Sequence, residues 1–145
     1  MTLANNKFFR LFMVILAFLL CLSFFALTPS ASAFETPVAY SSAYINSTTV
    51  SPTAGSGGAI SIAYSITGTG VMDQIGTTGV DLYENGVLIK TYSGVMVSST
   101  YIYTGSITYS GTVGKSYYAF VGFKASKGGG SDNYSMQTTT VTAKN

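Results

Sequence analysis

Ile60-Ser61-Ile62-Ala63-Tyr64-Ser65-Ile66-Thr67 decides the fold, because apolar residues alternate in it with small or polar ones. Successive side chains of an extended strand point to opposite faces, so this segment has one apolar face and one small, polar face. The chain around it is rich in Thr, Ser, Tyr, Val, Ile and Gly, which favour half-buried pleated surfaces. We therefore expect an all-β protein.

The segment that follows predicts a β-hairpin. Val80–Tyr83 and Val87–Tyr92 both read as strands, and they flank Glu84-Asn85-Gly86. An Asn-Gly step accepts the positive φ angles that tight hairpin turns require. We expect the two strands to pair across this turn.

Two more strands are predicted nearer the C-terminus, since apolar residues share one parity in each. These residues are Tyr101, Tyr103, Gly105, Ile107 and Tyr109 in the first, and Tyr117, Ala119, Val121, Phe123 and Ala125 in the second. Ser110–Lys115 supplies the turn between them. Lys127–Asn133 then predicts a flexible connection, and Tyr134–Ala143 a closing strand.

An opening strand is expected within Val38–Val50, ended by Ser51-Pro52-Thr53. Gly68–Gly76 breaks the alternation, so we expect a loop with one helical turn there. The count reaches about seven strands in roughly 112 residues, a spacing typical of an antiparallel β-sandwich. Residues 34–145 are therefore predicted to form a single β-sandwich domain.

Residues 1–33 have the pattern of a secretory signal peptide. Lys7 and Arg10 precede an apolar run, Leu11–Leu27, and Ala31-Ser32-Ala33 offers small residues for cleavage before Phe34. The alternative is an uncleaved anchor, because about 17 residues is the lower limit for a membrane span. Cys21 follows Leu20 rather than a small residue, which argues against a lipoprotein. We expect a secreted, extracellular protein, with cell-surface association as a variant and no membrane contact after cleavage.

The chain from Phe34 on carries no net charge, because five lysines balance five acidic residues. They are Lys90, Lys115, Lys124, Lys127 and Lys144 against Glu35, Asp73, Asp81, Glu84 and Asp132. A near-neutral surface gives no electrostatic reason to expect nucleic acid as a partner. The only cysteine is Cys21, so packing rather than disulfides must stabilise the exported chain.

The reactive side chains that most enzymes use are missing from the sequence. It contains no His, which removes serine-type triads and the commonest zinc ligands. Asp81 and Glu84 are the best carboxylate pair for a carbohydrate-active enzyme, but residues three apart on a strand point to opposite faces. Asp132-Asn133 has oxygen ligands for calcium, yet an ordinary turn explains it better. We expect no catalytic site, metal or cofactor.

The aromatic residues provide the candidate binding site. If Tyr117 and Val121 face the core, Tyr118, Phe120 and Lys124 lie on the opposite face of their strand. Tyr83 is expected beside them across the sheet. A flat, weakly charged aromatic surface is typical of modules that hold sugars or protein partners. The alternative is that a loop or the N-terminal segment covers this face.

The run Gly114–Ala125, followed by a Gly-rich loop and a Thr-rich strand, resembles the last two strands of immunoglobulin-like and fibronectin type III-like domains. The resemblance implies that Tyr117 is a corner tyrosine whose hydroxyl returns to the backbone near Val113.

Further residues resemble a family of small secreted proteins of Gram-positive bacteria that has no assigned activity. They are Gly70–Asp73 with Ile75-Gly76, Tyr83-Glu84, Lys90–Tyr92 and Gly114–Ala119. This resemblance implies a bacterial source and an extracellular location, and transfers no active site.

The sequence thus favours a secreted, non-catalytic binding module with Tyr83, Tyr118, Phe120 and Lys124 as its contact face. The expected partner is a cell-wall glycan or a protein. The alternative is a structural or self-assembling extracellular component, because β-rich segments with little charge associate at their edges. Ligand and oligomeric state stay open at this stage.

Overall fold

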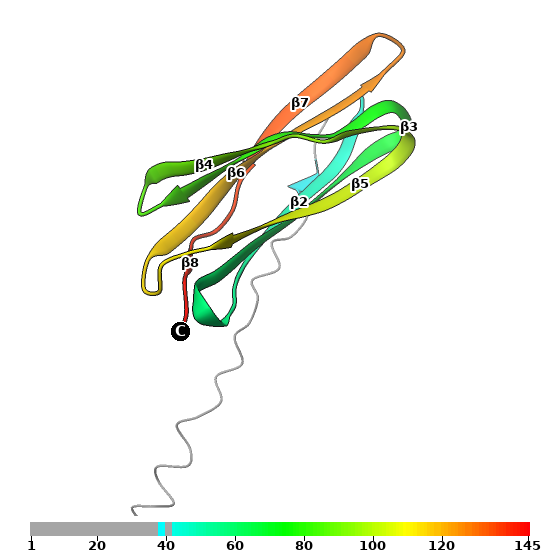
Figure 1. The fold of residues 1–145 in the computed structure, drawn as a ribbon. Coiled ribbons are helices and arrows are strands. Elements are labelled where there is room, and N and C mark those ends of the chain that lie inside the picture. The colour runs from blue at the N-terminus through cyan, green and yellow to red at the C-terminus, as the bar shows by residue number, and fades with distance from the viewer. Residues whose placement is uncertain (1–37, 40–41) are drawn as a thin grey trace, which may run out of the picture. The chain divides into compact units, whose positions relative to one another are not determined.

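The computed structural model describes residues 38–39 and 42–145, which form eight strands and one short 3-10 helix (Figure 1). The described residues lie in one compact unit. The elements are β1 (Val38–Ala39), β2 (Ile45–Ala54), η1 (Ser56–Gly58), β3 (Ala59–Glu84), β4 (Val87–Ser93), β5 (Met96–Ser110), β6 (Ser116–Lys127), β7 (Gly130–Gln137) and β8 (Val141–Thr142). All their pairings are antiparallel, so the all-β, antiparallel prediction is confirmed.

The 26-residue strand β3 holds the sheet together. Along one edge it pairs first with β2, through Ala54↔Ile60 to Ile45↔Gly68, and later with β6, through Gln74–Glu84. Along the other edge it pairs with β5 and then β4. The sheet therefore has two halves that share β3, namely β2–β3–β5 and β4–β3–β6–β7.

Strands β4 and β5 continue each other along β3. Val80↔Tyr92 and Ile75↔Val97 have the same register offset, although the strand assignment is interrupted between Ser93 and Met96. At the interruption the Thr77 N–H donates to the Val95 carbonyl at 2.9 Å. The two strands thus make one long, nearly continuous edge of the sheet.

The segment Gly68–Gly76 belongs to β3, so the predicted loop with a helical turn is wrong. Its broken alternation appears as a register shift, because the six residues from Thr67 to Met72 face only three on β5, Thr100–Ile102. A second shift against β6 lies between Thr77 and Gly79. Such irregularities bend a strand and increase its twist. They let the two halves of the sheet curl around one core.

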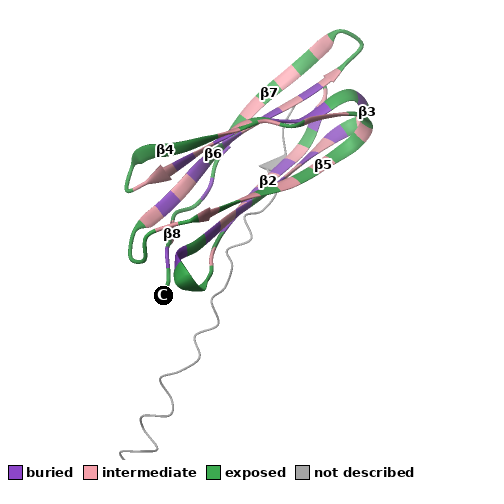
Figure 2. Ribbon diagram, viewed as in Figure 1, coloured by how far each residue is buried: buried purple, intermediate pink, exposed green. Residues whose placement is uncertain are grey.

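The core draws side chains from both halves. Ile62 and Ile66 in the first half, and Leu82, Val121 and Phe123 in the second, have no exposed surface and belong to one hydrophobic cluster. Figure 2 shows buried and more exposed residues alternating along β3 and β6. The predicted inward parity of Tyr117–Ala125 is confirmed, since all five residues of that parity are fully buried.

The hairpin prediction is also confirmed, because Asn85 and Gly86 form the turn between β3 and β4 with φ angles of 48° and 86°. The expected stop at Ser51–Thr53 is wrong. Pro52 lies within β2, opposite Ile62 and beyond the two residues that β1 covers. An edge position tolerates proline, because one side of the strand needs no ladder hydrogen bond.

The C-terminal strand differs from its prediction. Strand β7 starts at Gly130, inside the expected connection, and ends at Gln137, while Val141–Thr142 forms the separate strand β8. Only Gly128 and Gly129 make the turn after β6, and both have positive φ.

The start of the described sheet is tied to this β6–β7 hairpin. The Ser42 hydroxyl donates to Asp132, and the Tyr44 N–H donates to the same carboxylate at 2.8 Å. These hydrogen bonds, that of Ser42 first, hold the pKa of Asp132 below its ordinary value. Asp132 therefore has a structural role in the fold.

Tyr117 links the β5–β6 turn to the end of β3. Its hydroxyl accepts a hydrogen bond from the Thr112 N–H at 2.8 Å and donates one to the Glu84 carboxylate. Burial, followed by the Glu84 hydrogen bond, raises the pKa of Tyr117. The hydroxyl does return to upstream backbone, one residue before the expected Val113.

Tyrosine rings lie over glycines at several points of this packing. A Cβ added to Gly105 would come within 2.5 Å of the Tyr64 ring, and one on Gly111 within 2.8 Å of the Tyr117 ring. Tyr64 and Gly105 are direct cross-strand partners. The missing side chain therefore makes room for a buried aromatic ring.

We expect Gly105→Ala to lower the free energy of unfolding by about 1–3 kcal/mol, because the new methyl group would displace the Tyr64 ring. Gly70→Ala is the matched control, since a Cβ there meets no atom within 4 Å and its φ is not in the left-handed region. Urea unfolding of both variants measures the difference. Equal midpoints for the two variants would contradict the ring-over-glycine account.

Candidate functional site

Three aromatic side chains form a cluster on the outer face of the β4–β3–β6 half. Tyr83 on β3 and Tyr118 on β6 are cross-strand partners, and their rings stack with centroids 4.9 Å apart and an interplanar angle of 5°. Phe120 packs edge-on against both, at 5.7 and 6.0 Å. Stacked and edge-to-face arrangements are the favourable ones for aromatic pairs. We call these three residues the aromatic cluster.

The parity of β6 explains why the cluster faces outward. Tyr117, Ala119 and Val121 have no exposed surface, so the residues between them must point away from the core. Phe120 is 37% exposed. Residues 42–145 therefore leave this ring accessible, and the N-terminal segment considered as a cover lies mostly outside the described residues.

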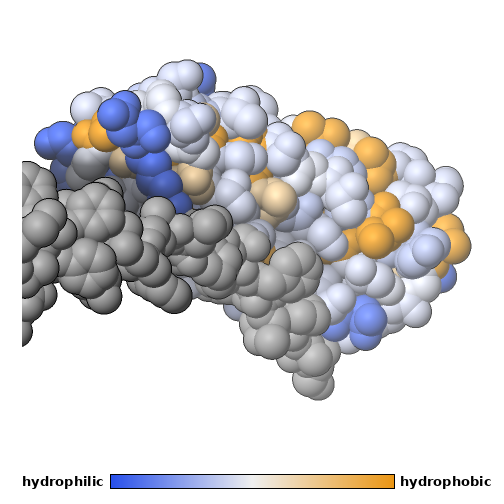
Figure 3. Space-filling model, turned by 90° about the horizontal axis from the view of Figure 1, so that it is seen from below, coloured by the Kyte–Doolittle hydropathy of each residue, from blue (hydrophilic) through white to orange (hydrophobic). Residues whose placement is uncertain are grey.

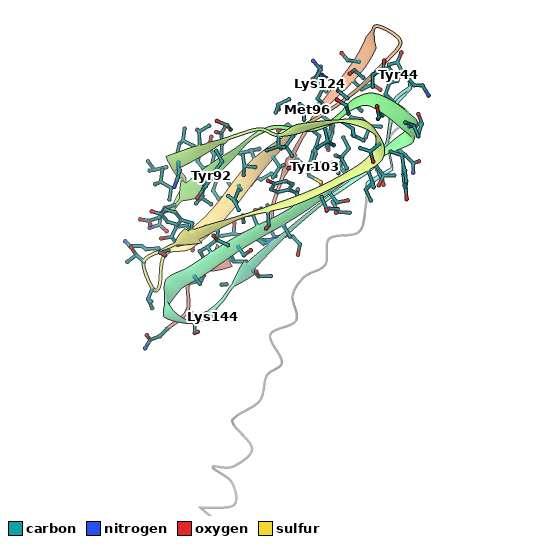
Figure 4. All side chains as sticks on the ribbon, turned by 45° about the vertical axis from the view of Figure 1, so that its right-hand side comes forward. Tyr44, Tyr92, Met96, Tyr103, Lys124 and Lys144 are labelled. Atoms are coloured by element: carbon teal, nitrogen blue, oxygen red, sulfur yellow. The ribbon has the colours of Figure 1, made fainter. Side chains whose placement is uncertain are left out.

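Lys124 does not join the aromatic cluster. It lies four residues beyond Phe120, about 13 Å along an extended strand, and its backbone partners are Gly76 and Asn133. Figure 4 places Lys124 near Met96, well away from Tyr92 on β4. The expected contact face of four residues is thus a compact group of three with a separate lysine.

A groove begins beside Phe120 and crosses the same face. Its volume is about 530 Å³, and its floor includes Gly79 and Gly122, which face each other across β3 and β6. A Cβ on Gly122 would clash with the Thr78 hydroxyl, so the floor depends on this glycine. Other lining residues are Asp81, Thr91, Phe120, Asn133 and Ser135.

The groove presents hydrogen-bonding groups from several strands. Asp81 on β3 accepts a hydrogen bond from the Thr91 hydroxyl on β4 at 2.6 Å, which orients its carboxylate. Asn133 and Ser135 reach the groove from β7. A carboxylate, an amide and hydroxyl groups thus surround a cavity that has an aromatic ring at one end. This arrangement can hold a ligand with several hydroxyl groups and one apolar face.

The two carboxylates considered for catalysis are not brought together. Glu84 accepts the hydrogen bond of the buried Tyr117 hydroxyl, whereas Asp81 is bonded to Thr91 in the groove. Within residues 38–39 and 42–145, no three His, Cys, Asp or Glu side chains are grouped so that they could hold a metal ion. The same residues contain no helix long and apolar enough to span a membrane.

Part of this site was not predictable from residue patterns along one strand. Thr91, Asn133 and Ser135 reach it only through the pairing of β4 and β7 with their neighbours. The glycine pair Gly79 and Gly122 was the available signal, because glycine within a strand often marks close approach or a hollow.

Comparison of the chain with protein-family models, with curated proteins and with solved structures finds no significant match. The case for function therefore depends on the geometry of the site.

We expect the stacked pair to stabilise the fold. In a double-mutant cycle with Tyr83→Leu and Tyr118→Leu, the coupling free energy should be about 0.5–1.5 kcal/mol. Tyr83→Leu combined with Tyr101→Leu on β5 is the control and should be additive. Chemical unfolding of the single and double variants gives both values, and a coupling near zero for the first pair would show that the stacking contributes nothing.

Proposed function

We propose that this protein is a secreted, non-catalytic binding module, and that its groove binds a neutral glycan at the bacterial cell surface. The observation that carries the proposal is the groove itself, in which the exposed Phe120 ring adjoins hydrogen-bonding groups from β3, β4 and β7. Its volume of about 530 Å³ lies in the range of small-ligand sites.

The chemistry of the groove suits a sugar better than a peptide or an ion. A pyranose ring has an apolar C–H face that packs on an aromatic ring, and a rim of hydroxyl groups that need donors and acceptors. Asp81 and Asn133 supply acceptors and an amide donor on opposite sides of the groove. The balance of charges in the chain from Phe34 on supports a neutral ligand over an anionic one.

The proposal includes export. In this proposal, residues 1–33 are a signal peptide that is cleaved before Phe34. The alternative is that residues 1–33 are retained as a membrane anchor. The structure does not describe residues 1–37. We also propose that the chain is related to the family of small secreted proteins of Gram-positive bacteria, because the residues named in the sequence analysis resemble that family.

For the fold, we propose that the two halves of the antiparallel sheet form an immunoglobulin-like β-sandwich. Two observations support it: both halves of the sheet contribute to one core, and the Tyr117 hydroxyl bonds to backbone upstream in the manner of a corner tyrosine.

Cleavage is tested by the mass of the protein recovered from the medium of an expressing Gram-positive host, which should start at Phe34. Ala31→Arg and Ala33→Arg should prevent processing, because a signal peptidase accepts only small side chains at these two positions. Ser32→Arg, between them, is the matched control and should still be processed. Recovery of a full-length chain starting at Met1 from the membrane fraction would support the anchor.

Binding is tested by pull-down of the purified chain from Phe34 on with peptidoglycan sacculi and by a glycan array. Phe120→Ala should weaken glycan binding at least tenfold, about 1.4 kcal/mol, because the ring supplies the apolar contact. Val113→Ala is the control, since Val113 in the β5–β6 turn is also exposed, at 49% against 37% for Phe120. Absence of glycan binding would contradict the ligand class, and binding that survives Phe120→Ala would contradict the site.

The alternative function, a structural or self-assembling extracellular component, is favoured by a different feature, the long edge of β4 and β5. Concentration-dependent fibres from the purified chain, without glycan binding, would support that alternative.

A further inference from the structure

The outer edge of β4 and β5 is long and almost uncharged. Within the described residues, β3 is the only strand that pairs with either of them, so no strand covers their other side. Side chains bond to part of the β5 backbone: the Tyr92 hydroxyl donates to the Thr108 carbonyl at 3.1 Å, and the Thr100 hydroxyl bonds to the N–H and the carbonyl of Ile102. Lys90 is the one charged residue from Val87 to Ser110, and β5 itself has none. Figure 3 shows one face of the molecule, which is mostly of intermediate hydropathy with separate hydrophobic and hydrophilic patches.

Exposed apolar side chains concentrate on this edge. Nine large hydrophobic residues of the described chain are exposed, and six of them lie between Val87 and Ile102. The six are Val87, Leu88, Ile89, Val95, Tyr101 and Ile102. Exposed apolar groups beside unpaired backbone are the combination that promotes strand pairing between chains.

The other edges carry protective features that β5 lacks. Strand β2 contains Pro52 and is partly covered by β1, and β7 contains the charged Asp132. Proline and charge both hinder the addition of a further strand. The irregularities of β5 lie near its start, where Ser99 has a φ of 57°, and Ile102–Ser110 pairs with β3 in one unbroken register.

We propose that Ile102–Ser110 pairs with the same segment of a second copy, antiparallel across a two-fold axis, to form a closed dimer. An antiparallel segment is complementary to itself, because each unpaired N–H meets a carbonyl of the partner when the chain is turned by 180°. Identical uncharged edges bring no repulsion.

The side chains of this segment permit the approach. Thr104, Ser106 and Thr108 occupy the exposed face of β5 and are small. They continue rows of small residues across the sheet, such as Thr49–Ser65–Thr104 and Thr53–Ser61–Thr108. The dimer would extend these rows from three strands to six.

Sedimentation equilibrium of the chain from Phe34 to Asn145, which contains every described strand, should give twice the monomer mass. Ile102→Lys with Thr104→Lys should shift the mass to that of the monomer, because the two copies would then oppose four added charges. Val113→Lys is the matched control, since Val113 is 49% exposed but lies in the β5–β6 turn. Circular dichroism checks that each variant is folded.

Cysteine cross-linking tests the geometry independently, because this form of the chain contains no cysteine. A single cysteine at Ser106, the centre of the segment, should give disulfide-linked dimers, because it faces its own copy across the two-fold axis. Single cysteines at Ile102 or Thr104 should give none, because their copies would lie about 13 Å or more apart along the paired strands. Ser61→Cys, on the central strand β3, should give none. A wild-type protein that stays monomeric at its highest soluble concentration, a dimer unaffected by the lysines, or open fibres would each overturn the proposal.

Discussion

The backbone pairing of β3 is the constraint on which the rest of the structure depends. This strand is paired along both edges, with β2 and then β6 on one side and with β5 and then β4 on the other. Because one strand belongs to both halves, the register shifts in its middle part, against β5 and then against β6, decide how the sheet curls. The second shift, between Thr77 and Gly79, places Thr78 against Gly122 and so shapes the floor of the groove.

Much of the fold was predictable wherever one strand could be judged by its own pattern. Alternation identified Ile60–Thr67, and the Asn85-Gly86 step identified the hairpin. The pattern failed at Gly68–Gly76, because pairing with β5 and β6 keeps the backbone extended although the side-chain alternation is lost. The strand end predicted at Pro52 was wrong for a related reason. Strand β2 can contain a proline because β1 covers only Ser47 and Thr48 of it.

The candidate site shows the same division between local and long-range information. Parity within β6 placed Tyr118 and Phe120 on one face, and Tyr83 was expected beside them across the sheet. Parity alone also assigned Lys124 to the group, because it carries no information on distance along the strand. Asn133 came from another strand, and only the registry of β6 with β7 brings it to the groove.

The low charge of this chain links its stability to its surface. Without disulfides, the described sheet is held by apolar packing and by tyrosine rings that lie over glycines, and both require small uncharged neighbours. From Val87 to Ser110 the same composition leaves one charged residue, Lys90, and no proline, although charge and proline are what usually protect sheet edges. The proposed strand pairing with an identical chain would cover the longest edge without adding a charge.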